Sequence, residues 1–181
     1  RKSMIIIDDV VDKETQDAIE CMVFSSDPKW VLSSNYSAPK RIPIIPEGFV
    51  KPQSFFFDIV KANNFRLVDP SYETYLSVLN KTEVRGLLKM RCVLHLPLTI
   101  TDSMKSWYPH LDALAKRDYN VDKFKVAVYY VNDSEGATTF YKETYQSAID
   151  KGLTATQITN SEMEVDQVVQ HKKGRLVVFD G

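Results

Sequence analysis

The sequence predicts an α+β fold in which helices pack on one face of an antiparallel sheet or flattened barrel. Helical patterns come first. Residues 12–24 and 71–79 each place apolar side chains at helical spacing, and each segment begins with a residue that suits a helix N-cap, Asp12 and Ser71. From residue 87 onward the pattern changes to strand-like alternation, clearest over residues 88–96 and 124–131. The 181 residues are therefore expected to form a single domain. Its two parts are a helical and irregular part over residues 1–86 and a strand-rich core over residues 87–181.

The remaining N-terminal segments carry weaker signals. Residues 4–7 and 30–32 are short apolar runs that predict strands, whereas residues 33–52 are rich in Pro, Ser and Asn and predict an irregular surface excursion. Residues 54–60 contain three consecutive phenylalanines, which suit either a strand or a buried helix. This segment stays open between the two.

The composition indicates an ordinary soluble, cytoplasmic domain. A formal net charge of -1 gives no electrostatic footprint for nucleic acid, so that partner is disfavoured. No apolar run approaches the ~20 residues of a membrane-spanning helix, so no membrane partner is expected. The two cysteines give no disulfide framework. Both Cys21 and Cys92 stand among apolar residues and are expected to be buried.

A His-x-Asp pair, His110 and Asp112, is the first candidate for chemistry. In an extended segment, residues two apart project from the same face, so an imidazole and a carboxylate would reach one point. A second imidazole from a distant strand would complete the facial triad of non-haem Fe(II) oxygenases. The triplet alone is weak evidence, because it is short and a lone histidine on a strand is more often structural than a ligand.

Tyr130 is the second candidate. Phe124, Val126, Val128 and Tyr130 fall on one face of the predicted strand, so Tyr130 is the polar-tipped residue of an apolar inner face, and Tyr129 is expected to point outward. A buried tyrosine hydroxyl needs a hydrogen-bond partner. That partner is either a carboxylate held inside the fold or a backbone carbonyl at its rim.

Three segments together carry a family resemblance: PHLD, then KVAVYYVNDSEGATTFY, then KKGRLVVFDG. Over about residues 88–181 the chain closely resembles the prolyl-4-hydroxylase-type branch of the Fe(II)- and 2-oxoglutarate-dependent oxygenases, which are common in bacteria and phages. The resemblance implies a double-stranded β-helix, a jelly-roll-like core, with N-terminal helices packed on one sheet. It also implies hydroxylation of an unactivated C–H bond in a small-molecule or peptide substrate. Peptidyl proline, a free amino acid, a nucleobase and a small metabolite all fit.

The resemblance also assigns roles to residues. His110 and Asp112 take the positions of the first two iron ligands, and Tyr130 takes the position that meets the distal carboxylate of 2-oxoglutarate. Gly136 opens the family's Gly-x-Thr-x-Phe strand, with Ala137 where an acidic residue is common. The implied cofactors are Fe(II) and the cosubstrate 2-oxoglutarate, with ascorbate as a further candidate.

One departure concerns the third iron ligand. In the family a second histidine follows the Gly-Arg strand and a basic residue comes later, so we expect the natural chain to continue past Gly181 with both. The sequence as given, which has two of the three ligands, is expected to have little activity. His171 is a poor substitute because it comes before the strand over residues 175–179, whereas the family's histidine comes after it. At ~3.3 Å per residue, the two ends of this strand are roughly 16 Å apart. His95 falls on the outer face or beside the cosubstrate. The alternatives are a non-catalytic jelly-roll binding module that has lost the third ligand and a cupin-type metal enzyme that does not use 2-oxoglutarate.

Overall fold

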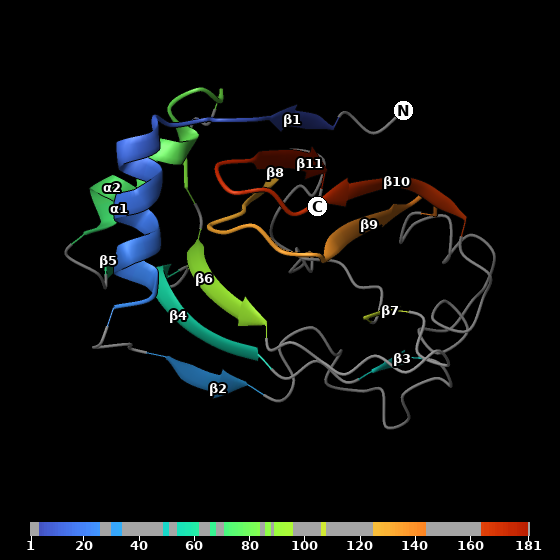
Figure 1. The fold of residues 1–181 in the computed structure, drawn as a ribbon, viewed down its shortest axis with the longest axis horizontal. Coiled ribbons are helices and arrows are strands. Elements are labelled where there is room, and N and C mark those ends of the chain that lie inside the picture. Colours follow the sequence, from blue (N-terminus) through green and yellow to red (C-terminus); the bar gives the residue numbers. More distant parts are fainter. Residues whose placement is uncertain are drawn as a thin grey trace.

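The protein has an α+β fold, with its helices gathered at one side of several small sheets (Figure 1). The computed structural model describes residues 4–25, 30–33, 49–50, 54–61, 66–67, 71–83, 86–87, 89–95, 106–107, 125–143 and 164–180. Both α-helices that the structure describes lie before residue 87, and strands follow it from Met90 to Asp180. Five further strands lie before residue 87, so strands are not confined to the second half of the chain.

Helix α1 (Lys13–Val23) begins where the sequence predicts. The Asp12 carboxylate accepts a hydrogen bond from the Thr15 N–H at 2.8 Å, which satisfies one of the free donors of the first turn, and Glu14 adds negative charge there. Helix α2 (Tyr72–Leu76) is shorter than predicted and continues as the 3₁₀ turn η1 (Ser77–Leu79).

The first sheet joins the beginning of the chain to its last described strand. It has the order β1 (Ile5–Ile7), β11 (Leu176–Asp180), β8 (Lys125–Tyr129), and both pairs are antiparallel. Strand β11 is therefore central, with Leu176 opposite Ile7 on one side and Tyr129 on the other. An ion pair between Lys125 and Asp180 closes the far end of β8 and β11.

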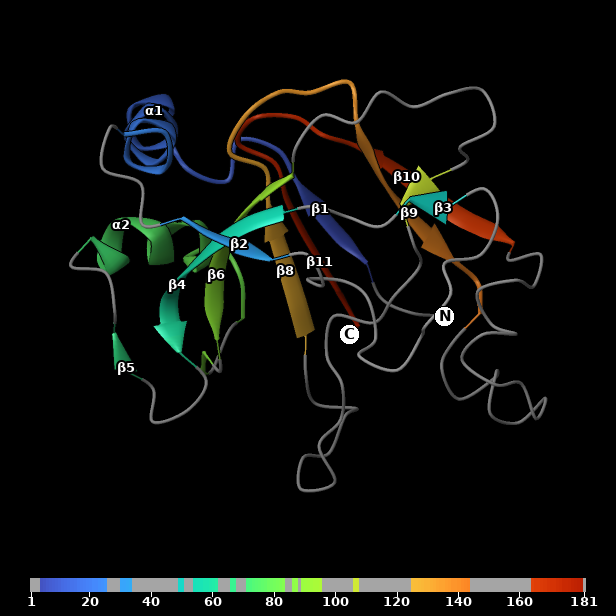
Figure 2. The ribbon, with the colours of Figure 1, turned by 90° about the horizontal axis from the view of Figure 1, so that it is seen from below.

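A second antiparallel pair is nested inside the first. Strand β9 (Ala137–Tyr141) follows β8 after a turn, and β10 (Val165–Gln170) precedes β11. Thus β8 pairs with β11 and β9 pairs with β10, and the β9–β10 ribbon lies away from the helices in both views (Figures 1 and 2).

The remaining strands lie beneath the helices or at the far edge. One sheet contains β2 (Val31–Ser33), β4 (Ser54–Lys61), β5 (Arg66–Leu67) and β6 (Met90–His95). The segment that the sequence left open is thus a strand, β4, and the alternating segment before residue 97 is β6. A parallel pair joins β3 (Phe49–Val50) to β7 (Ser106–Trp107).

Two hydrophobic clusters form on opposite faces of β11. Leu176 and Val177 are neighbours in sequence, both are 0% exposed, and they point into different clusters. The helix-side cluster joins α1 and α2 to β4 and β11 and consists of Val10, Ile19, Val23, Phe57, Ile59, Val60, Tyr75, Val78 and Leu176. The Tyr130 cluster lies on the other face and consists of Tyr130, Val169 and Val177, with Met4, Val128, Phe140 and Phe179 packed against them. A sheet covered on both faces explains why β11 is apolar along most of its length.

The finer fold prediction stays a prediction. In the ranges that the structure describes, the strands form small separate sheets and no closed or curled sheet. The helices and antiparallel sheets are shown, and the double-stranded β-helix is not. Neither α1 nor α2 has the length and apolar character needed to cross a membrane.

The expectation that both cysteines are buried is wrong for Cys21, which is exposed on α1. Cys92 on β6 packs against the helix-side cluster, and burial raises the pKa of its thiol to about 12. Because the thiolate is the reactive form, we expect iodoacetamide at pH 8 to modify Cys21 and to leave Cys92 unmodified in the folded protein. Peptide mass spectrometry before and after unfolding in urea checks this. Equal labelling of both thiols in the folded state would contradict the packing of Cys92.

Candidate functional site

The predicted iron ligands, His110 and Asp112, lie outside the described residues. Tyr130 is described. Its side chain is 8% exposed within the Tyr130 cluster, so it points away from solvent as strand parity predicts. The predicted cavity shared with His110 and Asp112 stays a prediction.

The backbone of Tyr130 is fixed on both sides of the residue. Its N–H donates to the carbonyl of Arg175 at 2.9 Å, and its carbonyl accepts from the N–H of Gly174 at 3.0 Å. Tyr130 directly follows β8, and residues 174–175 directly precede β11, so these two bonds extend the pairing of β8 and β11 by one step. The backbone from which the Tyr130 ring projects is thus held in place by two hydrogen bonds.

The hydroxyl of Tyr130 has a partner that the sequence did not suggest. It donates to Thr138 Oγ1 on β9 at 2.7 Å, instead of meeting a carboxylate or a backbone carbonyl. Burial raises the pKa of Tyr130, although the bond to Thr138 and the positive charge of Arg175 act in the other direction. The phenol is therefore protonated near neutral pH and serves as a donor.

His171 lies beside Tyr130 and Thr138. From the sequence it is a poor candidate for the third iron ligand, and no contact with Tyr130 is predicted. Its ring lies against Tyr130 with centroids 4.6 Å apart and an angle of 30° between the planes. Its Nε2 is 3.3 Å from Thr138 Oγ1, and its Nδ1 is 2.8 Å from Ser134 Oγ. Burial lowers the pKa of His171, so the imidazole is neutral near pH 7. We call Tyr130, Thr138, His171 and Ser134 the hydroxyl–imidazole chain.

The absence of a side chain at Gly136 leaves space for the His171 ring. A Cβ at this position would lie 3.0 Å from both Cε1 and Nδ1 of the ring, closer than such contacts normally are. The Gly136 carbonyl accepts from the His171 N–H at 3.1 Å, and its N–H donates to Ser134 Oγ at 3.3 Å. The glycine of the Gly-x-Thr-x-Phe pattern therefore has a packing reason in this chain.

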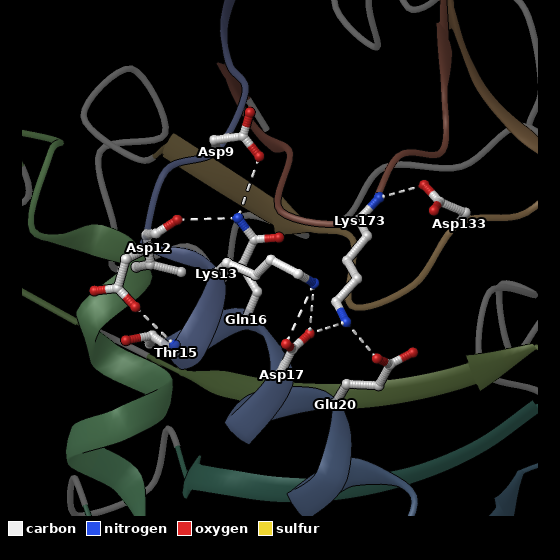
Figure 3. Close-up of polar contacts among 10 residues, drawn as sticks. Asp9, Asp12, Lys13, Thr15, Gln16, Asp17, Glu20, Asp133 and Lys173 are labelled. Carbon is white, nitrogen blue, oxygen red and sulfur yellow. Dashed lines mark hydrogen bonds and ion pairs between the residues drawn. The ribbon is translucent and has the colours of Figure 1, made fainter.

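The turn of residues 171–174 is anchored to α1 (Figure 3). The Lys173 N–H donates to Asp133 Oδ1 at 2.8 Å, and its ammonium group pairs with Asp17 and Glu20. These contacts raise the pKa of Lys173, with the bond to Asp17 as the largest cause. Individually such exposed pairs contribute little to stability, but together they fix where the turn lies against the helix.

A second group of charges anchors the start of β11. Arg175 donates to Asp8 through Nε at 2.6 Å and through Nη2 at 3.0 Å, and Lys172 reaches the same carboxylate at 3.0 Å. The hydrogen bond from Arg175, followed by that from Lys172, holds the pKa of Asp8 well below its usual range. Arg175 also donates to the carbonyl of Gln170 at 2.9 Å, so it braces the turn from both ends.

Tyr129 corrects one expectation. It faces away from Tyr130, as parity predicts, but it packs against the helix-side cluster and does not point into solvent. Its hydroxyl oxygen is buried, and no hydrogen bond to it is formed by the part of the chain that the structure describes. The face opposite the candidate site is thus a second core.

Replacing Tyr129 by Phe is expected to leave the free energy of unfolding unchanged or to raise it by about 1 kcal/mol, because an unpartnered buried hydroxyl is costly. Replacing Tyr130 by Phe breaks the bond to Thr138 and should lower it by roughly 0.5–1.5 kcal/mol. Urea unfolding of the two variants, which differ by the same single oxygen, makes the comparison. Equal losses would mean that the Tyr129 hydroxyl is stabilised after all.

The site offers hydrogen-bond donors more clearly than metal ligands. In the described ranges no group of three or more His, Cys, Asp or Glu side chains could hold a metal ion. Tyr130 and Thr138 supply hydroxyls, and His171 supplies a neutral imidazole; His95, at the end of β6, is exposed. Compared with family models, with curated proteins and with solved structures, the chain matches none.

Proposed function

We propose that the protein is an Fe(II)- and 2-oxoglutarate-dependent dioxygenase of the prolyl-hydroxylase type that hydroxylates a small-molecule or peptide substrate. The observation that carries the proposal is the hydroxyl of Tyr130. The family resemblance implies that this position meets the 2-oxoglutarate carboxylate, and the side chain is 8% exposed with its hydroxyl bonded to Thr138. A solvent-facing Tyr130 would have removed that support.

The nested pairing of strands supports a double-stranded β-helix as the architecture. The strands form one long antiparallel ribbon in which β8 and β9 follow each other on one side, and β10 and β11 follow each other on the other side. A ribbon of this kind can fold over at the turns between its two pairs, so that β8–β11 and β9–β10 come to face each other, as in a jelly roll. The Tyr130 cluster already joins the two pairs, since it contains Val169 of β10 and Val177 of β11, and the rings of Phe140 and Phe179 pack with centroids 4.9 Å apart.

The residues present fit the implied groups as far as their chemistry goes. Imidazole and carboxylate ligands from His110 and Asp112 suit Fe(II), and the buried hydroxyls of Tyr130 and Thr138 suit a carboxylate, which accepts hydrogen bonds only. The iron, when bound, supplies the activation of O₂ that C–H hydroxylation needs.

The chain's own contribution is a dry and rigid binding position. The apolar members of the Tyr130 cluster exclude water around the phenol, which strengthens a hydrogen bond to a charged ligand. The backbone bonds to residues 174 and 175 hold Tyr130 in place before the ligand arrives. Preorganisation of this kind reduces the entropic cost of binding.

The direct test measures Fe(II) binding and the conversion of 2-oxoglutarate to succinate. Asp112→Asn should reduce both by about 10- to 100-fold or more, because even the loss of a group behind a metal ligand costs that much. Asp166→Asn, which changes an exposed aspartate on β10, is the matched control and should behave as wild type. If Asp112→Asn binds Fe(II) as the wild type does, the assigned ligand is wrong.

A second measurement separates the alternatives. Tyr130→Phe should weaken 2-oxoglutarate binding by about 0.5–1.5 kcal/mol, or more if the contact is charge-assisted, while Tyr129→Phe leaves it unchanged. Metal binding without any binding of 2-oxoglutarate would favour the cupin-type enzyme. Binding of neither would favour the non-catalytic module.

A further inference from the structure

The contacts of the hydroxyl–imidazole chain are consistent with donation in one direction, from Tyr130 toward Ser134. A phenol is a stronger donor than an aliphatic alcohol, so Tyr130 gives its proton to Thr138 Oγ1 across the 2.7 Å contact. The single proton of Thr138 is then available to His171 Nε2, the other polar side-chain atom that approaches Oγ1 among the described residues. Nε2 therefore accepts.

The direction continues through the imidazole. A neutral imidazole has one N–H and one bare nitrogen, so an accepting Nε2 places the proton on Nδ1. From there it is donated to Ser134 Oγ at 2.8 Å, which also accepts from the Gly136 N–H. The exposed Ser134 leaves its own proton for water.

A carboxylate at Tyr130 allows the opposite direction. It accepts only, so the phenol must turn its proton from Thr138 to the ligand. Thr138 can then donate to the phenol oxygen, and its Oγ1 becomes an acceptor for His171. That requires a proton on Nε2, leaving Nδ1 to accept from the Ser134 hydroxyl.

We infer that His171 is a positioning residue that changes tautomer, from Nδ1–H to Nε2–H, when a carboxylate ligand binds at Tyr130. One proton is taken from water at Nε2 and one is released to water from Nδ1, so the charge of the imidazole does not change. The hydroxyls of Tyr130, Thr138 and Ser134 only rotate. The inference rests on the proposed function in taking 2-oxoglutarate as the carboxylate.

The structure favours this role over simple packing. A ring that only filled space against Tyr130 would not need polar partners on both nitrogens, yet His171 has one on each. The residues that hold it, Gly136 and the turn anchored by Lys173, also keep its position fixed while its proton moves. His171 thereby decides whether Thr138 can support the phenol in its ligand-binding orientation.

The test reads the tautomer directly by NMR of protein labelled with ¹⁵N-histidine. Zn(II) serves as a diamagnetic substitute for iron, and the ligands are 2-oxoglutarate and glutarate, which is a dicarboxylate without the chelating 2-oxo group. The free protein should show Nδ1–H at His171, and saturation with ligand should convert it to Nε2–H. In Thr138→Val, which breaks the chain, the ligand should cause no conversion.

Binding measurements on variants provide a second readout. His171→Phe keeps a ring on Tyr130 and removes both nitrogens, so ligand affinity should fall about two- to tenfold, as expected for one lost hydrogen bond. His171→Gln can return an amide N–H to Thr138 and should recover most of the loss. In a Tyr130→Phe background, His171→Phe should have no further effect.

The outcomes separate the two proposals. Binding of 2-oxoglutarate without a change of tautomer overturns the inference and leaves the proposed function standing. If glutarate binds and changes the tautomer of His171, but 2-oxoglutarate does not bind, the inference stands and the proposed function is overturned. An Nε2–H tautomer in the free protein, or binding of neither dicarboxylate, overturns the inference.

Discussion

Gly174→Ala is expected to lower the free energy of unfolding by about 2–4 kcal/mol, from a left-handed backbone cost of ~1–2 kcal/mol and the displacement of Gln16. Gly174 has φ +78°, and a Cβ there would lie 2.6 Å from the Cδ and Oε1 atoms of Gln16. That side chain is 7% exposed and donates to Asp9 at 3.2 Å and to the Val11 carbonyl at 3.0 Å (Figure 3). It cannot move without breaking these bonds.

The two contributions can be separated by urea unfolding of the wild type, Gly174→Ala, Gln16→Ala, the double variant and a control. Gly86→Ala is the control, since nothing lies within 4 Å of a Cβ at that position. Gln16→Ala in the Gly174→Ala background removes the clash but keeps the left-handed strain, so the double variant should lose less than the sum of the single ones. A Gly174→Ala loss no larger than that of Gly86→Ala would contradict the described turn.

The same glycine connects stability to the candidate site. Its N–H donates to the Tyr130 carbonyl and its carbonyl accepts from the Val10 N–H, so one residue joins the end of β8 to the segment before α1. This explains how a turn in the last part of the chain can position a tyrosine more than forty residues earlier. Local sequence patterns carry no sign of such a connection.

The elements that the sequence predicts well are those fixed by local chemistry. Helix α1 has its cap in Asp12, and the strands β6 and β8 show regular alternation, so their existence follows from neighbours in sequence. Strand β4 could not be distinguished from a helix, because three consecutive phenylalanines satisfy both periods. Its identity depends on the antiparallel partners β2 and β6.

For the candidate site, strand parity predicted that Tyr130 faces inward. The partners of Tyr130 depend on the pairing of strands that lie far apart in the sequence. Thr138 and His171 are 33 residues apart and meet because β9 pairs with β10, with Ala137 opposite Gln170. Parity also placed Tyr129 on the opposite face, but could not show that this face is the second core and not the surface. The positions of His110 and Asp112 stay predictions, since they fall outside the described residues.

Leu176→Ala is expected to lower the free energy of unfolding by about 2–5 kcal/mol, the range for removing a buried leucine side chain where the surroundings close only in part. Leu176 is 0% exposed at the centre of the helix-side cluster, where the helices meet β4 and β11. Ile5→Ala, on the neighbouring strand, removes a comparable side chain that is 54% exposed, and should cost no more than about 0.5 kcal/mol.

Trp30 makes the location of the damage measurable. Its ring packs edge-on against Phe57, with the centroids 4.8 Å apart, and contacts the helix-side cluster, whereas Val177 lies in the Tyr130 cluster. In a Trp107→Phe background, where Trp30 is the one tryptophan left, Leu176→Ala should therefore shift the tryptophan emission of the folded protein, whereas Val177→Ala should destabilise the protein without shifting it. If the two variants change the emission equally, or if Leu176→Ala costs no more than Ile5→Ala, the two clusters are not separated by β11 as described.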